Sequence, residues 1–538
     1  MKNVLLVLSL VSLILSASAK IEMGAPFSDG AILQRGMTVP VWGRVVPDAE
    51  DLAKPGEGGP KVALPGKRKI TVSFAGQEKT VESDAVSGRW KVELDPMEAS
   101  AESRTMTVIE EKQGFVFDST VSSLEIKDVL VGEVWFASGQ SNMECPIWGN
   151  NTRYRDMKGG LMTTMTHLPL VRYVKVPRAW SPAPKALQAK WSRFTADDLQ
   201  LFYRVKTGLG GPNTGVSLSA VAFYYARELY LALGIPVGIV DASWGGTNID
   251  AWTPRCGYEN CDPSIQATAD YKVKAGNDWK AEKDRQGPVG GPHQQPTVLW
   301  NGMVDAFAPM AMRGFIWYQG CHNSGESQLY CAKMHALYNG WSKAFANPDL
   351  KLYFVELAPY GQNWPGLCAA QEKFVDEERN AALAVTADVG NFDDIHPNDK
   401  EIIAKRLVAH ALKRDYGFDI PEDCSPVFRS ATFKDGQAVL SFDHVKDWYV
   451  YAPNRSREAA FEVAGANGAW EAAKIVNFRK GKDRKGNPTD TDFIDGPTIV
   501  VASDKVAEPV RVRYMVKPRT AGTMYNEASL PLGVFESK

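Results

Sequence analysis

The sequence lacks an excess of charge of either sign. Lys and Arg total 61 against 63 Asp and Glu, so the formal net charge is -2 over 538 residues. Neither nucleic acid nor an anionic membrane surface is an expected partner, because binding to either requires a basic excess. The remaining composition, with 44% hydrophobic, 10% aromatic and 23% charged residues, is typical of a soluble globular protein of about three domains.

Long apolar runs are also scarce. The apolar stretch Val4–Leu15 follows one lysine and precedes the small residues Ala17, Ser18 and Ala19. This pattern predicts a secretory signal peptide cleaved after Ala19, hence a protein exported to the periplasm or the extracellular space. The alternative is an uncleaved anchor, but no second apolar segment or charged stop-transfer flank follows, so no membrane span is expected in the mature chain.

The sequence has no Cys-x-x-Cys motif and no Cys/His spacing typical of metal ligands. We therefore expect neither a structural zinc site nor any other metal. Seven cysteines in an exported chain permit disulfides but leave at least one thiol unpaired. The local pairs to consider are Cys256 with Cys261 and Cys321 with Cys331.

Three regions differ in their hydrophobic pattern. After the signal peptide at 1–19, residues 20–127 consist of short alternating segments bounded by Gly, Pro or Asp, which predicts a β-sandwich domain. Residues 128–420 predict an α/β domain, and residues 421–538 return to short strands of a smaller β module. No internal repeat is visible, which disfavours a solenoid or a propeller.

In the central region, apolar strands alternate with helical patterns at 219–233, 330–346 and 398–414. Strands buried on both faces and separated by helices predict a parallel sheet with helices on both sides. Ligands of such sheets bind at the carboxyl ends of the strands. Four loops follow predicted strands and should meet there: the loop at Ser141 and the loops 244–248, 319–323 and 393–396.

The stretch VWFASGQSNMECPIWG ends an apolar strand at a polar turn that contains Ser141. A hydroxyl at the tip of a buried strand is held rigidly, which makes Ser141 a candidate nucleophile. The alternative is that Ser and Gly serve here only as ordinary turn residues.

Only seven histidines could act as the base. His396 follows Asp393 by three residues and precedes Pro397, which opens an amphipathic helix. We expect Asp393 to orient the imidazole while its other nitrogen faces a serine. Asp394 is the competing carboxylate, expected to point away or to cap the helix. Alone, an Asp-x-x-His segment is more typical of a capping and solvation arrangement than of a catalytic pair.

Oxyanion donors must be backbone N–H groups or a side-chain amide. The backbone of Gly245 and Gly246 and the amide of Asn323 supply candidates, although Gly-Gly and Asn are common in ordinary loops.

Four ordered blocks resemble the sialate O-acetylesterase family of carbohydrate esterases, within the SGNH hydrolase superfamily. They are GQSNM (139–143), SWGGTNIDAWT (243–253), LWNGMVDAFAPMAMRGFIWYQG (299–320) and DDIHPNDK (393–400). Gly139 and Met143 flank Ser141, so the turn is not the Gly-x-Ser-x-Gly elbow of other hydrolases.

The resemblance implies a secreted serine esterase that removes O-acetyl groups from sialic acid or other acetylated glycans through an acetyl-enzyme intermediate, without a cofactor. It implies Ser141 as nucleophile, His396 as base and Asp393 as orienter, with an oxyanion hole from the Ser141 N–H, Gly245 or Gly246, and Asn323. The further residues expected to contact substrate are Gln140, Asn142, Trp244, Gln319 and His322.

One departure from the family pattern concerns the loop before Asn323. The family reads Trp-Tyr-Gln-Gly-Glu-Ser-Asn, whereas Cys321 and His322 stand here in place of the Glu and Ser. Contacts made by the missing carboxylate are thereby put in question, and Cys321 or His322 becomes a rival reactive group. The alternative function is a non-catalytic carbohydrate-binding protein on an esterase scaffold, and the sequence indicates no oligomeric state.

Overall fold

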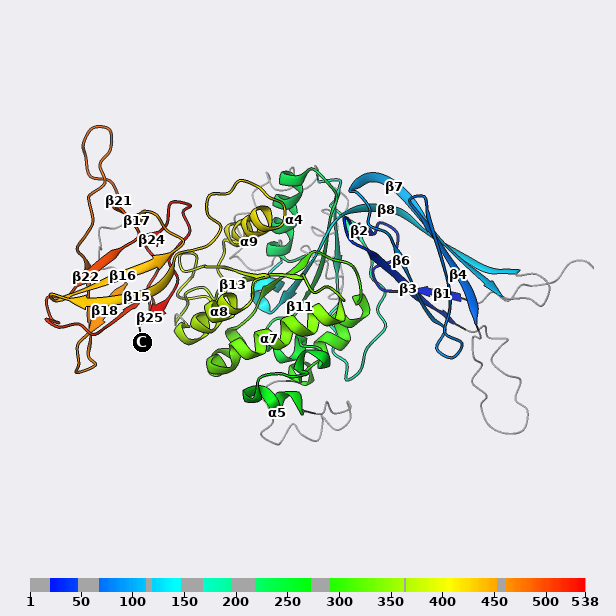
Figure 1. Cartoon of the computed structure of the whole chain (residues 1–538), viewed down its shortest axis with the longest axis horizontal. Coiled ribbons are helices and arrows are strands. Elements are labelled where there is room, and N and C mark those ends of the chain that lie inside the picture. The colour runs from blue at the N-terminus through cyan, green and yellow to red at the C-terminus, as the bar shows by residue number, and fades with distance from the viewer. Residues whose placement is uncertain are drawn as a thin grey trace, which may run out of the picture.

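The computed structural model describes residues 20–46, 67–112, 119–146, 168–194, 218–271, 291–361, 364–451 and 460–537. The expected signal peptide at 1–19 lies outside these residues. Figure 1 shows an elongated molecule with N-terminal strands at one end, a helix-covered sheet in the middle and C-terminal strands at the other end. Over the described ranges, no helix is long and apolar enough to cross a membrane.

Most of the N-terminal strands form antiparallel pairs. One sheet has the order β1-β3-β6, while β4, β5 and β7 join the N-terminal half of β8, and β2 pairs in parallel with β8. Their alternating burial reflects one face packed on the core, as in β6 with its pattern of exposed and buried residues. The bounds are β1 (Lys20–Met23), β2 (Ile32–Gln34), β3 (Val39–Val46), β4 (Arg68–Phe74), β5 (Gln77–Glu82), β6 (Arg89–Leu94), β7 (Ser100–Lys112) and β8 (Ser119–Gly139).

Strand β8 connects the N-terminal strands to the central sheet. It pairs with β7 up to Val131 and then runs parallel to β11 and β12 from Glu133 to Gly139. The boundary expected between residues 127 and 128 therefore falls inside one strand. At that point Asp128 adopts a left-handed φ of 58° and forms an ion pair with Arg172 at 3.0 Å.

The central strands follow the order β10-β9-β11-β8-β12-β13-β14. All neighbours from β9 to β14 are parallel, as the alternation of strands and helices predicted, and β10 is antiparallel at one edge. Because the N-terminal strands join the same sheet, it is mixed rather than purely parallel. The bounds are β9 (Val171–Lys175), β10 (Ser192–Arg193), β11 (Val237–Ser243), β12 (Gly314–Tyr318), β13 (Lys351–Val355) and β14 (Ala381–Ala384).

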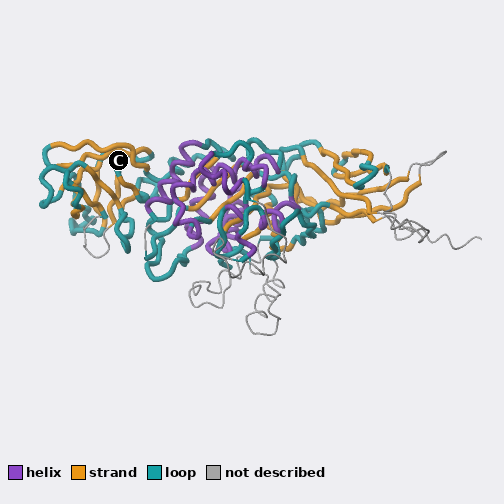
Figure 2. The backbone as a smooth tube through the Cα atoms, turned by 90° about the horizontal axis from the view of Figure 1, so that it is seen from below, coloured by secondary structure: helices purple, strands orange, loops and turns teal. Residues whose placement is uncertain are grey.

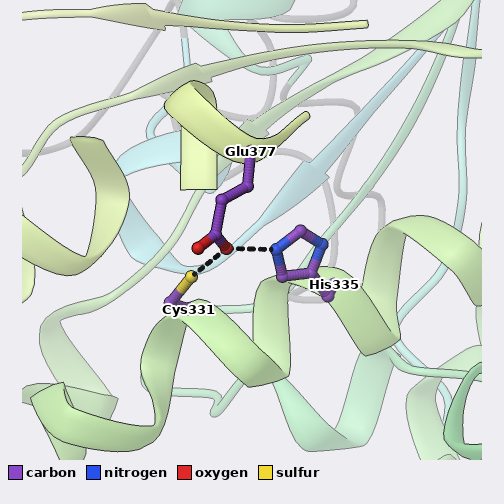
Figure 3. A group of neighbouring side chains, drawn as sticks. All are labelled: Cys331, His335 and Glu377. Atoms are coloured by element: carbon purple, nitrogen blue, oxygen red, sulfur yellow. Dashed lines mark hydrogen bonds and ion pairs between the residues drawn. The ribbon is translucent and has the colours of Figure 1, made fainter. Parts of the chain in front are cut away.

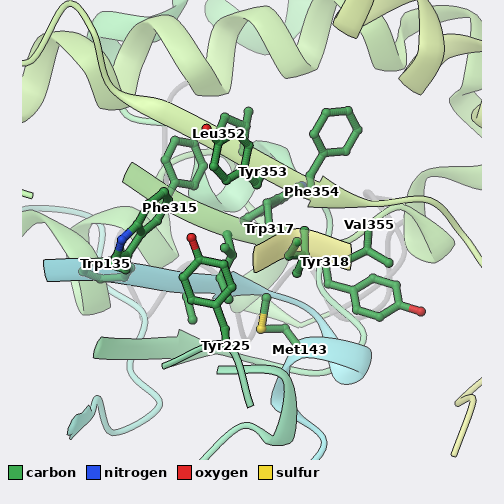
Figure 4. Packing of buried hydrophobic residues seen from close by; sticks show 14 of the residues in the cluster. Trp135, Met143, Tyr225, Phe315, Trp317, Tyr318, Leu352, Tyr353, Phe354 and Val355 are labelled. Atoms are coloured by element: carbon green, nitrogen blue, oxygen red, sulfur yellow. The ribbon is translucent and has the colours of Figure 1, made fainter. Parts of the chain in front are cut away.

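Two neighbouring aromatic residues of β8 show how helices cover both faces of the sheet. Successive side chains of a strand point to opposite faces. Trp135 contacts Tyr225 of α4, with ring centroids 5.1 Å apart, whereas Phe136 contacts Trp341 of α7 at 5.2 Å. Figure 4 shows Trp135 and Tyr225 with the neighbouring aromatic residues of β12 and β13 in this core. Helix α9 packs against α4 and contacts β13 and β14.

The three predicted helical segments form α4 (Ala220–Leu233), α7 (Ser327–Ala344) and α9 (Lys400–Arg414). Ser219 caps α4 by accepting from the Ala222 N–H, and Gly234 ends the helix with a φ of 66°. Helix α8 (Pro365–Glu377) was not predicted, because its buried stripe is short and interrupted by charged residues. The structure also describes the short helices α1 (Ser141–Glu144) and α5 (Gln266–Ala269).

The C-terminal strands form three antiparallel sheets, with orders β15-β16-β22-β20, β21-β17-β24 and β19-β18-β23-β25. Figure 2 shows that strands and loops dominate both ends of the molecule, while the helices gather in the middle. The bounds are β15 (Val427–Lys434), β16 (Gln437–Asp443), β17 (Trp448–Tyr451), β18 (Phe461–Ala464), β19 (Trp470–Ala472), β20 (Lys474–Ile475), β21 (Thr491–Ile494), β22 (Ile499–Ala502), β23 (Arg511–Tyr514), β24 (Met524–Tyr525) and β25 (Phe535–Glu536).

Candidate active site

Ser141 stands at the carboxyl edge of the sheet, where β8 ends and α1 begins. Gly139 makes this turn possible: its φ is 140°, and a Cβ there would lie 2.3 Å from the Tyr318 carbonyl oxygen. Gln140 donates its N–H to the same carbonyl at 3.0 Å, while the buried residue Met143 anchors α1. The Ser141 hydroxyl is therefore held on a short, firmly anchored turn, and the residue itself is half-buried.

His396 and Asp394 complete a hydrogen-bonded series with Ser141. The His396 Nε2 atom lies 3.0 Å from the Ser141 Oγ atom, and Nδ1 lies 3.1 Å from an Asp394 carboxylate oxygen. The same oxygen accepts the His396 backbone N–H at 3.1 Å. A carboxylate at Nδ1 favours the tautomer whose Nε2 lone pair faces the hydroxyl. This arrangement has the geometry of a nucleophile, a base and an orienting acid.

The expectation that Asp393 orients the imidazole is wrong. Its side chain is 81% exposed and forms an ion pair with Arg519 at 3.0 Å, whereas the Asp394 side chain is only 5% exposed. A tight turn causes the difference: the Asp394 N–H donates to the Asn391 carbonyl, and the Asp393 N–H donates to the Asn391 side chain. The turn directs Asp394 inward and leaves Asp393 outside, so Asp394 neither points away nor caps α9. The cap is Asp399, which accepts the Ile402 N–H.

The expected role of Gly245 as an oxyanion donor is contradicted by its hydrogen bond. Gly245 lies beside the nucleophile, since a Cβ built on it would stand 3.2 Å from the Ser141 Cβ. Its N–H, however, donates to a Glu144 carboxylate oxygen at 2.7 Å. Arg178 forms an ion pair with the same carboxylate. Gly246, with a φ of 73°, is the exposed residue of this turn. Glu144 was missed although it lies in the nucleophile turn.

Asn323 is held firmly by neighbouring groups. Its Oδ1 atom accepts the Ile249 N–H at 3.0 Å and the Gln319 amide at 2.7 Å. Its NH2 group donates to Glu326 at 2.9 Å, and the side chain is buried. An amide nitrogen carries two hydrogens, so one remains beyond the bond to Glu326. These contacts fix the direction of the amide group.

Three residues expected to contact substrate are buried instead. The Gln140 side chain accepts the backbone N–H groups of Gly320 and His322, which joins the nucleophile turn to the following loop. Gln319 is enclosed and donates to the Thr247 carbonyl at 3.0 Å. Asn142 is 2% exposed and bonded to protein groups on both sides. The Gln140 oxygen and the Gln319 and Asn142 amides bond to other segments of the protein, so they hold the loops together.

Trp244 and His322 are accessible, as their expected contact with substrate requires. Trp244 is half-buried and stacks on His293, with ring centroids 4.9 Å apart and planes within 4°. The Arg178 guanidinium lies over the indole at 5.6 Å. His322 is exposed as a whole residue, but its imidazole ring is partly enclosed, and this desolvation lowers the pKa of the ring. Gln294, which was not predicted as a site residue, supports the loop 244–248 by accepting the Asn248 N–H at 3.0 Å.

Comparison with known proteins relates the chain to esterases. It is 27% identical over 390 residues to the sialate O-acetylesterase of Rattus norvegicus, covering 65% of this chain and 68% of that protein. The human sialate O-acetylesterase is 26% identical over 385 residues, with 66% of each chain covered. The chain is a homologue of the sialate O-acetylesterases. The matched part thus spans about two thirds of the length of these relatives.

A solved structure extends the relationship over nearly the whole chain. The carbohydrate acetylesterase from Xanthomonas citri is 27% identical, with a TM-score of 0.70, and the match covers 96% of this chain and all of that one. No family model matches the sequence. Together these relationships identify a carboxylic ester hydrolase with a mixed α/β fold.

The cysteines do not form either of the two local disulfides considered from the sequence, Cys256 with Cys261 and Cys321 with Cys331. All seven lie in the described part of the chain, and none is joined to another by a disulfide. Cys331 faces α8, where its thiol donates to Glu377 at 3.4 Å, so it points away from Cys321. Cys256 donates to the Gly340 carbonyl and Cys261 to Gln266. Burial raises the pKa of the Cys321 thiol to about 12, which makes it a poor nucleophile near neutral pH.

Three groups among the described residues bring three potential metal ligands within 4.8 Å of one another, and none includes His396. Figure 3 shows one of them, in which Cys331 and His335 of α7 both face the Glu377 carboxylate of α8. His335 Nε2 lies 2.9 Å from that carboxylate. Burial raises the pKa of the Cys331 thiol to about 12, so the protonated thiol serves as a hydrogen-bond donor. This group is satisfied by its own hydrogen bonds.

Proposed function

We propose that this protein is a serine esterase that removes O-acetyl groups from sialic acid or other acetylated glycans through an acetyl-enzyme intermediate. The observation that carries the proposal is the position of His396, with Nε2 at 3.0 Å from the Ser141 hydroxyl and Nδ1 at 3.1 Å from Asp394. The homologous sialate O-acetylesterases and carbohydrate acetylesterase support the choice of an acetylated sugar as substrate.

In the first half of the reaction, the Ser141 Oγ atom attacks the acetyl carbonyl carbon. His396 Nε2 takes the hydroxyl proton and then gives it to the departing sugar oxygen. Asp394 stabilises the imidazolium by its hydrogen bond at Nδ1, without taking the proton itself. The products of this half are the deacetylated sugar and an acetyl ester on Ser141.

In the second half, water takes the place of the sugar. His396 Nε2 removes a proton from water, the resulting hydroxide attacks the acetyl-Ser141 carbonyl, and the proton returns to Ser141 Oγ. Acetate leaves, and the free hydroxyl again faces His396. No cofactor is needed for either half.

The negative oxygen formed in both halves requires hydrogen-bond donors. We assign the Ser141 N–H, at the first residue of α1, and the second amide hydrogen of Asn323, with Gly246 as a further candidate. The contacts of Asn323 with Ile249, Gln319 and Glu326 favour this role, because an oriented donor needs no rearrangement during the reaction.

The proposal includes export and three structural parts. A signal peptide cleaved after Ala19 would place the enzyme where acetylated polysaccharides occur, outside the cytoplasm. Sandwich-like β modules at 20–127 and 421–538 would flank the catalytic part at 128–420. N-terminal sequencing of protein recovered from the medium or the periplasm tests the cleavage site, which should leave Lys20 as the first residue.

The reaction is tested with p-nitrophenyl acetate and with a panel of O-acetylated sialic acids and plant oligosaccharides. We expect acetate release from at least one sugar, and Ser141→Ala should abolish it while the variant still unfolds at the wild-type temperature. Ser324→Ala, which alters a half-buried serine in the neighbouring loop, serves as the control. Binding of glycans without acetate release would instead favour the carbohydrate-binding alternative.

A further inference from the structure

We infer that Lys400 and Asn142 form a positioning pair that holds Ser141 and His396 at the correct separation. This inference rests on the proposed function, because it concerns the same nucleophile and base. Lys400 Nζ donates to the Asn142 Oδ1 atom at 2.6 Å, and the Asn142 NH2 group donates to the Ile395 carbonyl at 3.1 Å. The two residues thus connect the beginning of α9 with both catalytic loops.

Asn142 and its partner Ile395 are the chain neighbours of the nucleophile and the base. Asn142 directly follows Ser141 in α1, and Ile395 directly precedes His396. Asn142 and Ile395 are 253 residues apart in the chain, and the Asn142 amide joins the two segments by a hydrogen bond. Each residue of this bond is the immediate neighbour of a reacting residue. A shift of this amide therefore changes the distance between the Ser141 hydroxyl and the His396 imidazole.

Lys400 determines which way the Asn142 amide faces. An ammonium group has donors and no acceptor, so it can bond only to the amide oxygen. With the oxygen turned toward Lys400, the NH2 group must face the Ile395 carbonyl, as observed. Without Lys400 the buried amide oxygen loses its donor, so the amide is held only at its NH2 end and can shift relative to the Ile395 carbonyl. Such a shift would move the nucleophile turn relative to the histidine loop.

The placement of Lys400 is unfavourable for stability, which points to a functional reason for it. Its side chain is buried at the first residue of α9, where the positive end of the helix dipole repels a cation. Within the described part of the chain, no carboxylate forms an ion pair with it. Apolar burial of this kind lowers the pKa of Lys400 to about 8.

Several groups around Lys400 stabilise its charged form. The Tyr318 ring of β12 lies 5.4 Å from Nζ and attracts it through its π face. Asp399 on the same helix, Cys145 after α1 and Cys321 before α7 are the titratable groups that act on it. None of them replaces the short bond to the amide oxygen, so Asn142 is the contact through which Lys400 acts.

Lys400→Met tests the inference, because Met nearly preserves the side-chain volume and removes the donor. We expect kcat for p-nitrophenyl acetate to fall by about 10- to 100-fold, as for a small misplacement of reacting groups, with KM changed less than about twofold. The melting temperature should stay the same or rise, since a buried charge has been removed. Lys405→Met is the matched control, because Lys405 lies on the same helix with 54% of its side chain exposed.

A double-mutant cycle shows whether Lys400 acts through Asn142. Asn142→Leu alone should lower kcat at least as much as Lys400→Met, and the double variant should be no slower than Asn142→Leu. Multiplied losses would overturn the inference, since they would mean that Lys400 acts independently. Asn142→Asp gives a second test, which does not require the fold to accept Met at position 400. The new carboxylate supplies a counter-charge for Lys400 but cannot donate to the Ile395 carbonyl. This variant should be stable and slow, and a stable variant with wild-type kcat would contradict the inference.

Labelling by a fluorophosphonate, which reacts with activated serines, separates this inference from the proposed function. The labelling rate of Ser141 should fall in Lys400→Met in parallel with kcat, and it should be unchanged in Lys405→Met. If Ser141→Ala keeps its activity, the proposed function fails. If Ser141→Ala is inactive while Lys400→Met has wild-type turnover and labelling, the positioning role alone is refuted.

Discussion

Replacing Asp394 with Asn tests the control of the His396 tautomer. In the structure, one Asp394 oxygen faces Nδ1 and also accepts the His396 N–H, each at 3.1 Å. An Asn side chain can present its NH2 group to Nδ1, which places the ring proton on Nε2 and removes the lone pair that faces Ser141. Turnover should fall by about 10⁴, or roughly 5 kcal/mol of transition-state stabilisation, with little change in KM.

Asp393→Asn is the matched control for this prediction. The Asp393 carboxylate is 81% exposed, and its ion pair with Arg519 stands at the surface, where such pairs contribute little. Its kcat should stay within about twofold of the wild type. Both variants are assayed over a full range of p-nitrophenyl acetate concentrations, and thermal unfolding verifies that each is folded. A larger loss in Asp393→Asn, or wild-type turnover in Asp394→Asn, refutes the assignment.

Four further outcomes are expected. Asn323→Asp keeps the Oδ1 acceptor for Ile249 and Gln319 but removes the amide donor, so kcat should fall by about 10² to 10³ in steady-state assays; unchanged turnover would mean that backbone donors suffice. Complete burial raises the pKa of Glu356 from 4.5 to about 7, so its neutral form stabilises the fold and this contribution is lost as pH rises from 4.5 through about 7. Urea unfolding should show that the free energy of unfolding falls more over that range for the wild type than for Glu356→Gln, with a difference on the order of 3 kcal/mol. The double change Cys321→Glu with His322→Ser restores the family pattern and should shift the preference among acetylated sugars while keeping the reaction; an identical substrate profile would remove this loop from specificity. Dialysis against EDTA should leave esterase activity unchanged, and a loss reversed by added metal would contradict the serine mechanism.

The central sheet could be predicted because its signal is local. Strands such as β11 and β12 are buried at every residue, and helices such as α4 carry an apolar face with a cap at Ser219. The mixed character of the sheet could not be predicted in the same way. Strand β8 continues from antiparallel to parallel pairing without a break in its own pattern, and only its partners along the chain reveal the change.

The meeting of Ser141 with His396 could also be anticipated, because both follow predicted parallel strands whose carboxyl ends share one edge. The directions of the other side chains could not. Gln140, Asn142 and Gln319 were expected to face substrate, yet the Gln140 oxygen and the Asn142 and Gln319 amides bond to groups of other segments of the chain. An amide in a polar turn has the same local sequence whether it faces solvent or a neighbouring segment, so burial alone decides its role.

The sequence by itself determined which elements form and which residue types gather at the edge of the sheet, since hydrophobic periodicity and turn residues act over a few positions. The tertiary structure alone decided which of two adjacent aspartates serves the imidazole. Arg519, 126 residues away, pairs with Asp393, while the turn at Asn391 directs Asp394 inward. Likewise, Glu144 accepts the N–H of Gly245, which lies 101 residues away in the chain. Lys400 orients Asn142 although 258 residues separate the two in the chain. These contacts depend on atoms that meet only after the chain has folded, so no local pattern encodes them.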